Sequence, residues 1–172
     1  IGDEAGTAIT TGDNNTAVGY QAGYTNSTGS QNASVGGYAL YFNEASDNSA
    51  FGYNALFSST TGASNTAVGS NSLAFNTTGA NNTAVGYQSL YTSTGNNNTA
   101  VGYKAATALT TATNVVAVGD NAYLYGTTGG HTVAVGTNAL LLNTTGAYNV
   151  AVGQQALNSN TTTNFNTATG YQ

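Results

Sequence analysis

The chain has no proline, cysteine, methionine or tryptophan, and only 4% of its 172 residues are charged. A typical soluble domain has about 25% charged residues. Six acidic residues and a single lysine, Lys104, give a formal net charge of −5 at pH 7. Nucleic-acid binding needs a basic surface that neutralises phosphates, so this class of function is excluded. The absence of cysteine says little about the compartment, because a long ladder of backbone hydrogen bonds needs no disulfide.

Long apolar runs and clusters of catalytic or metal-binding residues are also missing. No stretch approaches the roughly 18 apolar residues of a membrane-spanning helix, so we expect a protein that is not embedded in a membrane. His131 is the only histidine, and no second histidine or cysteine is present to join it in a metal or catalytic site. The six acidic residues do not recur from repeat to repeat as they do in calcium-binding solenoids. The sequence therefore predicts no enzyme, no cofactor and no metal site.

The feature that the chain does have is one short period. NNTAVGYQAGY at residues 14–24 returns as NNTAVGYQSLY at residues 81–91. An apolar residue followed by glycine recurs every 16 or 17 residues, and the glycines are Gly2, Gly19, Gly36, Gly52, Gly69, Gly86, Gly102, Gly119, Gly136, Gly153 and Gly170, the last of them preceded by Thr169. This is a 17-residue repeat, present about ten times, and its strict register argues against a disordered low-complexity tract. We number each repeat from this glycine as position 0.

The repeat alternates with a period of two around its glycine, which is typical of a β-strand. Position −1 is usually valine, position −2 is always small, position +3 is alanine or serine, and position +4 is usually leucine. A Thr-Thr-Gly turn follows, and the two 16-residue repeats lose their residue around residues 44–48 and 95–98. We expect one strand before the glycine and a second over +3 to +7. The valine at −1 and the leucine at +4 are expected to point inward and form the core.

Seventeen residues with two short strands cannot bury an apolar face alone, whereas stacked copies can. The fold class that we predict is all-β, a parallel β-solenoid (β-roll) with one repeat per turn, over residues 1–172 as a single domain. Each position becomes a ladder of like residues about 4.8 Å apart, which explains why charge is avoided.

The strictly small positions −2 and 0 suggest that another backbone approaches closely, either the opposite wall of a thin coil or a neighbouring subunit. We favour lateral association, with three chains around one axis. The chain begins at Ile1 and stops inside a repeat. We therefore expect an excerpt of a longer fibre, or copies that stack end to end into a filament.

The repeats resemble a known family. NVVAVGDNA (residues 114–122), TVAVGTNA (132–139) and NVAVGQQA (149–156) are similar to the Asn-Ser-Val-Ala-Ile-Gly-x-x-Ala repeat of trimeric autotransporter adhesin heads, the YadA-like haemagglutinin-repeat proteins. Val-Gly-Tyr-Gln-Ala-Leu variants also resemble repeat arrays of proteins with tail-fibre domains. The resemblance implies a left-handed β-roll that trimerises on the bacterial surface. The adhesin repeat is typically 14 residues long, and the extra residues of this chain fall in the Thr-rich turn.

Three groups of residues are candidates for contact or modification. Tyrosine recurs at +1 (Tyr20, Tyr53, Tyr87, Tyr103), and with the aromatic residues at +5 it forms either a surface-binding stripe or a stack between coils. Asparagines before the Thr-rich turn begin possible N-glycosylation sequons (Asn26, Asn76, Asn143, Asn160), and Asn14, Asn32, Asn81 and Asn97 also fit the pattern. The threonine pairs at +8 and +9 make ice binding a candidate function. Ice-binding faces need threonines on one side, however, and adjacent residues of a strand point to opposite sides.

These observations predict a structural or adhesive segment of an extracellular fibre, on a cell surface or an appendage. A phage or virus tail-fibre shaft is the structurally similar alternative. A carbohydrate-binding module that uses the tyrosine stripe is an alternative from another class. The expected partners are copies of the same chain, and host surfaces, matrix or glycans.

Overall fold

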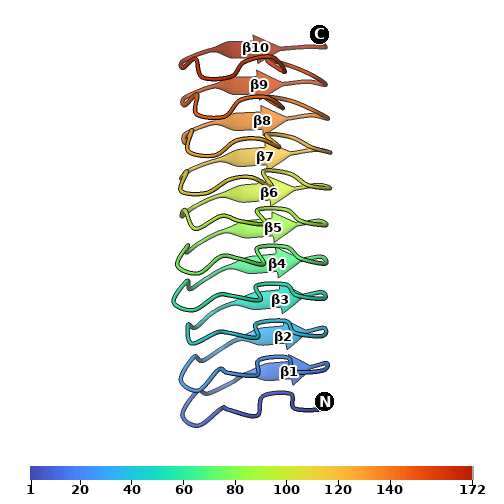
Figure 1. Cartoon of the computed structure of the whole chain (residues 1–172), viewed down its shortest axis with the longest axis vertical. Coiled ribbons are helices and arrows are strands. Elements are labelled where there is room, and N and C mark those ends of the chain that lie inside the picture. The colour runs from blue at the N-terminus through green and yellow to red at the C-terminus, as the bar shows by residue number, and fades with distance from the viewer. Residues whose placement is uncertain (172) are drawn as a thin grey trace.

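The computed structural model of the chain describes residues 1–171, and it consists of ten short strands joined by turns (Figure 1). Each strand has three residues: β1 Thr16–Val18, β2 Ala33–Val35, β3 Ser49–Phe51, β4 Thr66–Val68, β5 Thr83–Val85, β6 Thr99–Val101, β7 Val116–Val118, β8 Val133–Val135, β9 Val150–Val152 and β10 Thr167–Thr169. They form one sheet in chain order. All neighbouring strands are parallel, and their register is one repeat, as in the pairing of Ala67 with Ala84. The predicted all-β parallel solenoid with one repeat per turn is confirmed.

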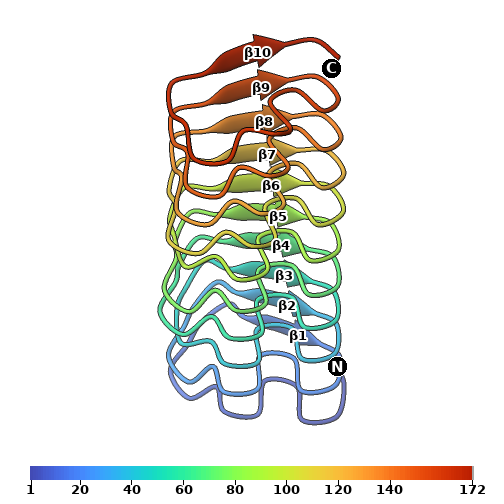
Figure 2. The same cartoon turned by 45° about the horizontal axis from the view of Figure 1, so that its top comes forward.

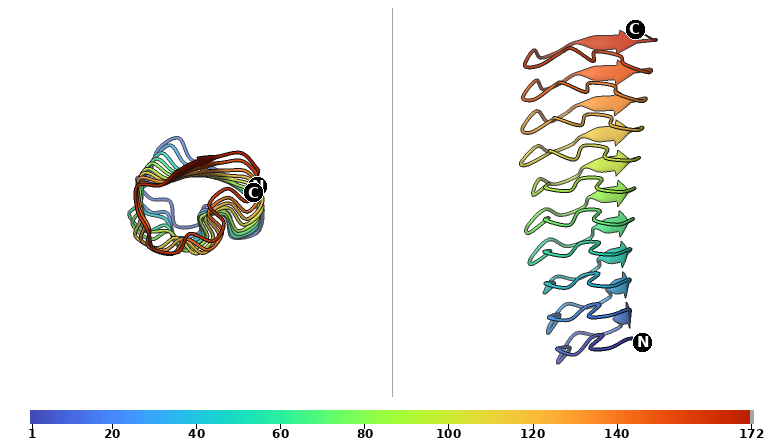
Figure 3. Two further views of the ribbon diagram at one scale, coloured as in Figure 1. Left: turned by 90° about the horizontal axis from the view of Figure 1, so that it is seen from above. Right: turned by 45° about the vertical axis from the view of Figure 1, so that its right-hand side comes forward.

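The coils stack into a column with the sheet along one side and irregular turns around the rest (Figure 2). Viewed along the column, successive coils follow nearly the same outline (Figure 3). This regularity follows from the sequence, because each residue lies beside its equivalent in the next coil and the same contacts repeat.

The side chains of the strands point the opposite way from our expectation. The small residue at −2 is buried, and Ala67, Ala84 and Ala100 are completely inaccessible. The residue at −1 points outward, so that Val18 and Val68 are 37% and 38% exposed. The prediction that the −1 valines form the core is therefore wrong. The interior is narrow, and only a small side chain at −2 leaves room for the leucine at +4, which is buried as predicted (Leu40, Leu56, Leu73, Leu90, Leu140).

The second predicted strand, over +3 to +7, does not form. This segment is a series of turns in which positions +2 and +4 both have left-handed backbone conformations, with φ of 59° at Asn71 and 48° at Leu73. Such a conformation costs a non-glycine residue about 1–2 kcal/mol. It is compensated by contacts between coils, because the Leu73 amide donates to the Ser89 carbonyl at 3.0 Å and the leucine side chain is buried.

The glycine at position 0 is needed because the next coil lies close to it. At Gly36 φ is +130°, and an added Cβ would lie 2.6 Å from the carbonyl oxygen of Gly52. The equivalent glycines have φ between +121° and +144°. The close backbone that we inferred from the small residues is therefore that of the next coil at position 0, whereas the small residue at −2 is buried in the narrow interior. These positions no longer argue for a neighbouring subunit.

The two short repeats lose a residue of the threonine pair. Asn32 Nδ2 donates to the Ala45 carbonyl at 2.8 Å, and Asn82 Nδ2 donates to the Gly95 carbonyl at 2.9 Å. Full-length repeats make the same bond to the glycine of the Thr-Thr-Gly turn, as Asn65 does to Gly79. The deletion in the second short repeat thus precedes Gly95, slightly earlier than the range 95–98 that we predicted.

A column of asparagines at +13 runs through the interior. In each step the Asn side-chain oxygen accepts from the backbone N–H of the next +13 residue, and its Nδ2 donates to the next +10 carbonyl. The column is continuous through Asn15, Asn32, Asn48, Asn65, Asn82 and Asn98. It ends at Val115, whose N–H donates to Asn98 Oδ1 at 3.0 Å but whose side chain has no amide to continue the column. The column resumes between Asn149 and Asn166.

Tyr123 maintains this bonding where the asparagines are missing. It replaces the leucine at +4, and its hydroxyl donates to the Gly129 carbonyl at 2.6 Å. The +7 position of the same coil is Gly126, where an added Cβ would lie 2.4 Å from the tyrosine ring. The large residue and the glycine therefore occur together for a steric reason.

Candidate functional site

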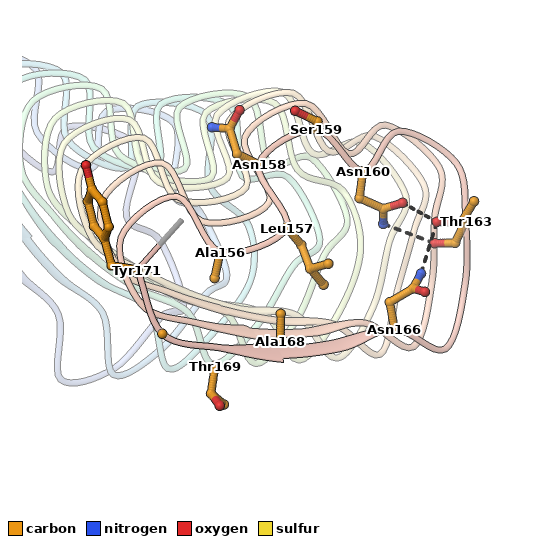
Figure 4. Close-up of a pocket in the computed structure, with 11 residues that line it drawn as sticks. Ala156, Leu157, Asn158, Ser159, Asn160, Thr163, Asn166, Ala168, Thr169 and Tyr171 are labelled. Atoms are coloured by element: carbon orange, nitrogen blue, oxygen red, sulfur yellow. Dashed lines mark hydrogen bonds between the residues drawn. The ribbon is translucent and has the colours of Figure 1, made fainter.

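The interior offers little room for a ligand along most of the column. A cavity of about 10 Å³ lies beside Gly23, which replaces the leucine at +4, and this is at the lower limit for one water molecule. A recess of about 460 Å³ is the open mouth of the last coil (Figure 4). Ala168 points into this mouth while Thr169 points away from it. The residues that line this recess occupy positions that, in the other coils, are covered by the following coil. The recess therefore reflects the uncovered end of the stack.

The asparagines at +7 are structural. Asn26, Asn76 and Asn143 are no more than 2% exposed, and Asn160 is half-buried. The Asn76 amide donates to the Gly79 carbonyl and accepts from the Gly79 N–H, both at 2.8 Å. The sequence placed these side chains beside an exposed turn, but the coil directs them inward, where a glycan has no space in the folded chain. Among the other sequons Asn32 is buried, while Asn14, Asn81 and Asn97 at +12 are exposed and accessible to modification.

The threonines at +8 also hold the coils together. The Thr60 hydroxyl donates to the Thr77 carbonyl at 2.9 Å, and Thr110 donates to Thr127 at 3.0 Å. The same bond joins Thr10 to Ser27, Thr127 to Thr144, and Thr144 to Thr161. Hydroxyls that are committed to neighbouring coils do not form the free, regular array that ice binding requires.

The tyrosines at +1 are exposed: Tyr20, Tyr53, Tyr87 and Tyr103 have exposed fractions between 41% and 54%. They do not form one continuous stripe. Tyr87 and Tyr103 stack at 5.4 Å between ring centroids, whereas Tyr20 and Tyr53 are joined only through Tyr38 at +2. At +5 the rings of Tyr24, Tyr41 and Phe57 do stack in successive coils at 5.1 and 5.2 Å, as one of the two interpretations predicted.

The outer face of the sheet carries a column of apolar side chains. Its −1 column contains Val18, Phe51, Val68 and Val152, each between 37% and 42% exposed. Between β7 and β9 valine also occupies position −3, which widens the apolar band at Val116, Val133 and Val150. Our expectation that −1 points inward concealed this surface, although the strict preference for valine was visible in the sequence.

Titratable groups are few and scattered. His131 stacks on Tyr148 with 4.8 Å between ring centroids, and Tyr148 stacks on Phe165. Burial alone would raise the pKa of Glu44, but hydrogen bonds from the hydroxyls and N–H groups of Ser27 and Thr28 outweigh it and lower that pKa.

Within residues 1–171 no three His, Cys, Asp or Glu residues lie close enough to hold a metal ion. The same residues include no helix long and apolar enough to cross a membrane.

A surface recess that the sequence did not suggest surrounds the single lysine. It has a volume of about 390 Å³ and lies over three successive coils, with Tyr103, Lys104 and Tyr125 among its lining residues. Its floor is low because Thr107 and Ala108 occupy +5 and +6, where the flanking coils have Tyr91 and Tyr125. Alignment of the repeats contains part of this signal, since Thr107 interrupts a +5 column in which most residues are aromatic or large.

Comparison of the chain with models of protein families, with curated proteins and with solved structures found no match. The fold and the surfaces described above are therefore the basis for assigning a function.

Proposed function

We propose that the chain is a structural and adhesive segment of an extracellular surface fibre. The observation that supports this best is the uninterrupted parallel stack of ten strands, paired in register from β1 to β10. A column held by repeated backbone and asparagine bonds is a stiff rod, because bending it would strain the same bonds in every coil. Such a rod holds the Asn, Thr and Tyr side chains of its turns away from the surface that bears it.

Lateral association of three copies through the outer sheet face is part of this proposal. The −1 column, with its additional valines at β7 to β9, is an apolar band of exposed and half-buried side chains that runs from β1 to β9. A contiguous band of this kind is typical of an association surface. The low charge of the chain also favours close packing of identical copies, since it places few like charges opposite one another.

The oligomeric state of the purified chain tests this assembly. We expect light scattering after size exclusion to give three times the chain mass of 17.1 kDa. Val68→Lys would place a charge in the band and shift the protein to monomers, whereas Thr61→Lys, in an exposed turn, would not. A monomeric wild-type chain would remove the trimer from the proposal.

Electron microscopy of the native material tests the fibre itself. We expect thin rods at the cell surface that bind gold-labelled antibodies against the chain. Label on virus particles would favour the tail-fibre shaft, and isolated globular particles would contradict both.

A further inference from the structure

We propose that the recess around Lys104 binds a carboxylated sugar, with the carboxylate at Lys104 and the sugar ring against Tyr103 and Tyr125. This deepens the adhesive role proposed above by naming its ligand class. The recess volume of about 390 Å³ lies at the lower end of the range for small-ligand sites, roughly 300–1,000 Å³, and is sufficient for one or two sugar rings.

The polar groups of the recess form a column at +2. Gln88, Lys104 and Asn121 occupy this position in three successive coils, so that the lysine lies between two residues with amide side chains along the column. Backbone hydrogen bonds fix the column: the Lys104 amide donates to Tyr87 at 2.8 Å, and the Asn121 amide donates to Tyr103 at 2.9 Å. Both Lys104 and Asn121 have a left-handed backbone, with φ of 53°, and both side chains are partly exposed.

The side chains of Gln88, Lys104 and Asn121 make no hydrogen bond to residues 1–171, whereas some of their equivalents in other coils do. At +2 in other coils the Asn54 amide donates to Asn71 at 3.3 Å, and the Gln21 amide donates to Glu4. Around Lys104 the two amides and the ammonium group therefore remain available to the hydroxyl and carboxylate groups of a ligand. A hydrogen bond from an ammonium group to a carboxylate is about twice as strong as a bond between neutral groups.

Two half-exposed tyrosines give the recess its apolar surfaces. Tyr103 and Tyr125 are 50% and 51% exposed, and the Lys104 ammonium lies 5.3 Å from the centre of the Tyr103 ring. The C–H face of a sugar ring packs well on an aromatic face, which carries partial negative charge. The combination of ring faces, amides and one cation fits a sugar acid better than a lipid or a simple anion, which would not use all three kinds of group.

The repeat supplies matched variants for a test, because each substitution introduces a residue that another coil has at the same position. Lys104→Gln follows Gln21 and Gln155, Tyr125→Ser follows Ser58, and Ala108→Phe follows Phe75 and fills the recess. Tyr53→Ser, which follows Ser70, is the control because it removes an exposed tyrosine outside the recess. Circular dichroism and thermal unfolding verify that all four variants fold.

Binding is measured on the purified chain by calorimetry and by amide chemical shifts. The probes are trigalacturonate and 3′-sialyllactose, each with a methyl-esterified neutral form, and a hexaglutamate peptide. We expect one or both acidic sugars to bind and to shift the amides of Lys104 and Asn121. Lys104→Gln and methyl esterification should each weaken binding about tenfold, the effect of one charge-assisted hydrogen bond. Ala108→Phe should abolish binding, and Tyr53→Ser should not change it.

Three results would overturn the proposal: no binding of either acidic sugar, equal binding of the esterified forms, or equal binding of the glutamate peptide. Because the test uses the isolated chain, its failure would leave the proposed fibre intact. Failure to find fibres would likewise leave a measured sugar site standing.

Discussion

The side-chain oxygen of Asn65 accepts a hydrogen bond from the backbone N–H of Asn82, one coil further on, at 2.9 Å. The Asn65 Nδ2 group donates to the Gly79 carbonyl of that same coil, also at 2.9 Å. One fully buried amide thus satisfies a donor and an acceptor of the next coil. Repetition of this pair makes the polar interior possible, because buried backbone groups without partners would be costly.

The first prediction concerns this pair. Asn65→Asp replaces the Nδ2 donor with an oxygen that faces the Gly79 carbonyl oxygen, so we expect a loss of about 3 kcal/mol or more at neutral pH. Burial should raise the pKa of the new carboxyl group above its unfolded value of about 3.9. The deficit is therefore smallest below that pH, where both states are protonated, and it grows as the pH rises through the folded pKa. Urea unfolding at about pH 4 and pH 7 measures it, with the exposed Asn81→Asp as control.

The second prediction uses two adjacent glycines. Gly36→Ala should cost at least about 2 kcal/mol, because φ is +130° and the new Cβ would lie 2.6 Å from the Gly52 carbonyl oxygen. Gly37→Ala should change stability by less than about 0.5 kcal/mol, since its Cβ would meet only the Tyr53 ring, at 3.4 Å. Urea unfolding of the two variants compares them directly. Equal effects would mean that the position-0 ladder does not constrain the coil.

The third prediction is a coupling between Tyr123 and Gly126. Gly126→Asn alone should be strongly destabilising, because its Cβ would lie 2.4 Å from the tyrosine ring. Tyr123→Leu alone removes the hydroxyl that donates to Gly129. The double variant restores the leucine and asparagine of other coils, such as Leu73 and Asn76, and should be more stable than the sum of the single changes predicts. A double-mutant cycle should give a favourable coupling of about 1–3 kcal/mol, and additivity would refute the steric explanation.

The fourth prediction follows from the pKa of Tyr123, which burial raises from 10.0 to about 12. A phenol whose folded pKa exceeds its unfolded pKa stabilises the fold fully below pH 10 and loses that contribution as the pH rises towards 12. We expect the stability of the wild-type chain to fall more steeply over this range than that of Tyr123→Phe. Thermal unfolding at several alkaline pH values tests this, and parallel curves would contradict it.

The fifth prediction tests the direction of the strand side chains. Ala67→Leu should destabilise the coil by about 1–3 kcal/mol, because it overpacks a completely buried position. Val68→Thr should cost little, because Val68 is 38% exposed and Thr169 occupies the same position in β10. Thermal unfolding ranks the two variants, and the reverse order would restore the inward-pointing valine that we first predicted.

Several features of this protein could be derived from the sequence alone. The 17-residue period fixes a parallel stack with one repeat per coil, because a strand of three residues is stabilised only by its neighbours. The glycine at position 0, the buried leucine at +4 and the small size of the residue at −2 follow from the same period, although their packing partners do not. Alternation with a period of two shows that −1 and −2 lie on opposite faces, but it does not say which face is inside.

Only the tertiary structure decided that question, and with it the surfaces available for function. The interior of a 17-residue coil is too narrow for a valine opposite the leucine at +4, so Ala67 is buried and Val68 faces outward. The turns carry Asn76 inward to the Gly79 backbone rather than outward to a glycan. The recess at Lys104 depends on residues from three coils, separated by a full repeat in sequence and brought together by stacking. Local sequence determines each coil, whereas contacts between coils determine which side chains are exposed.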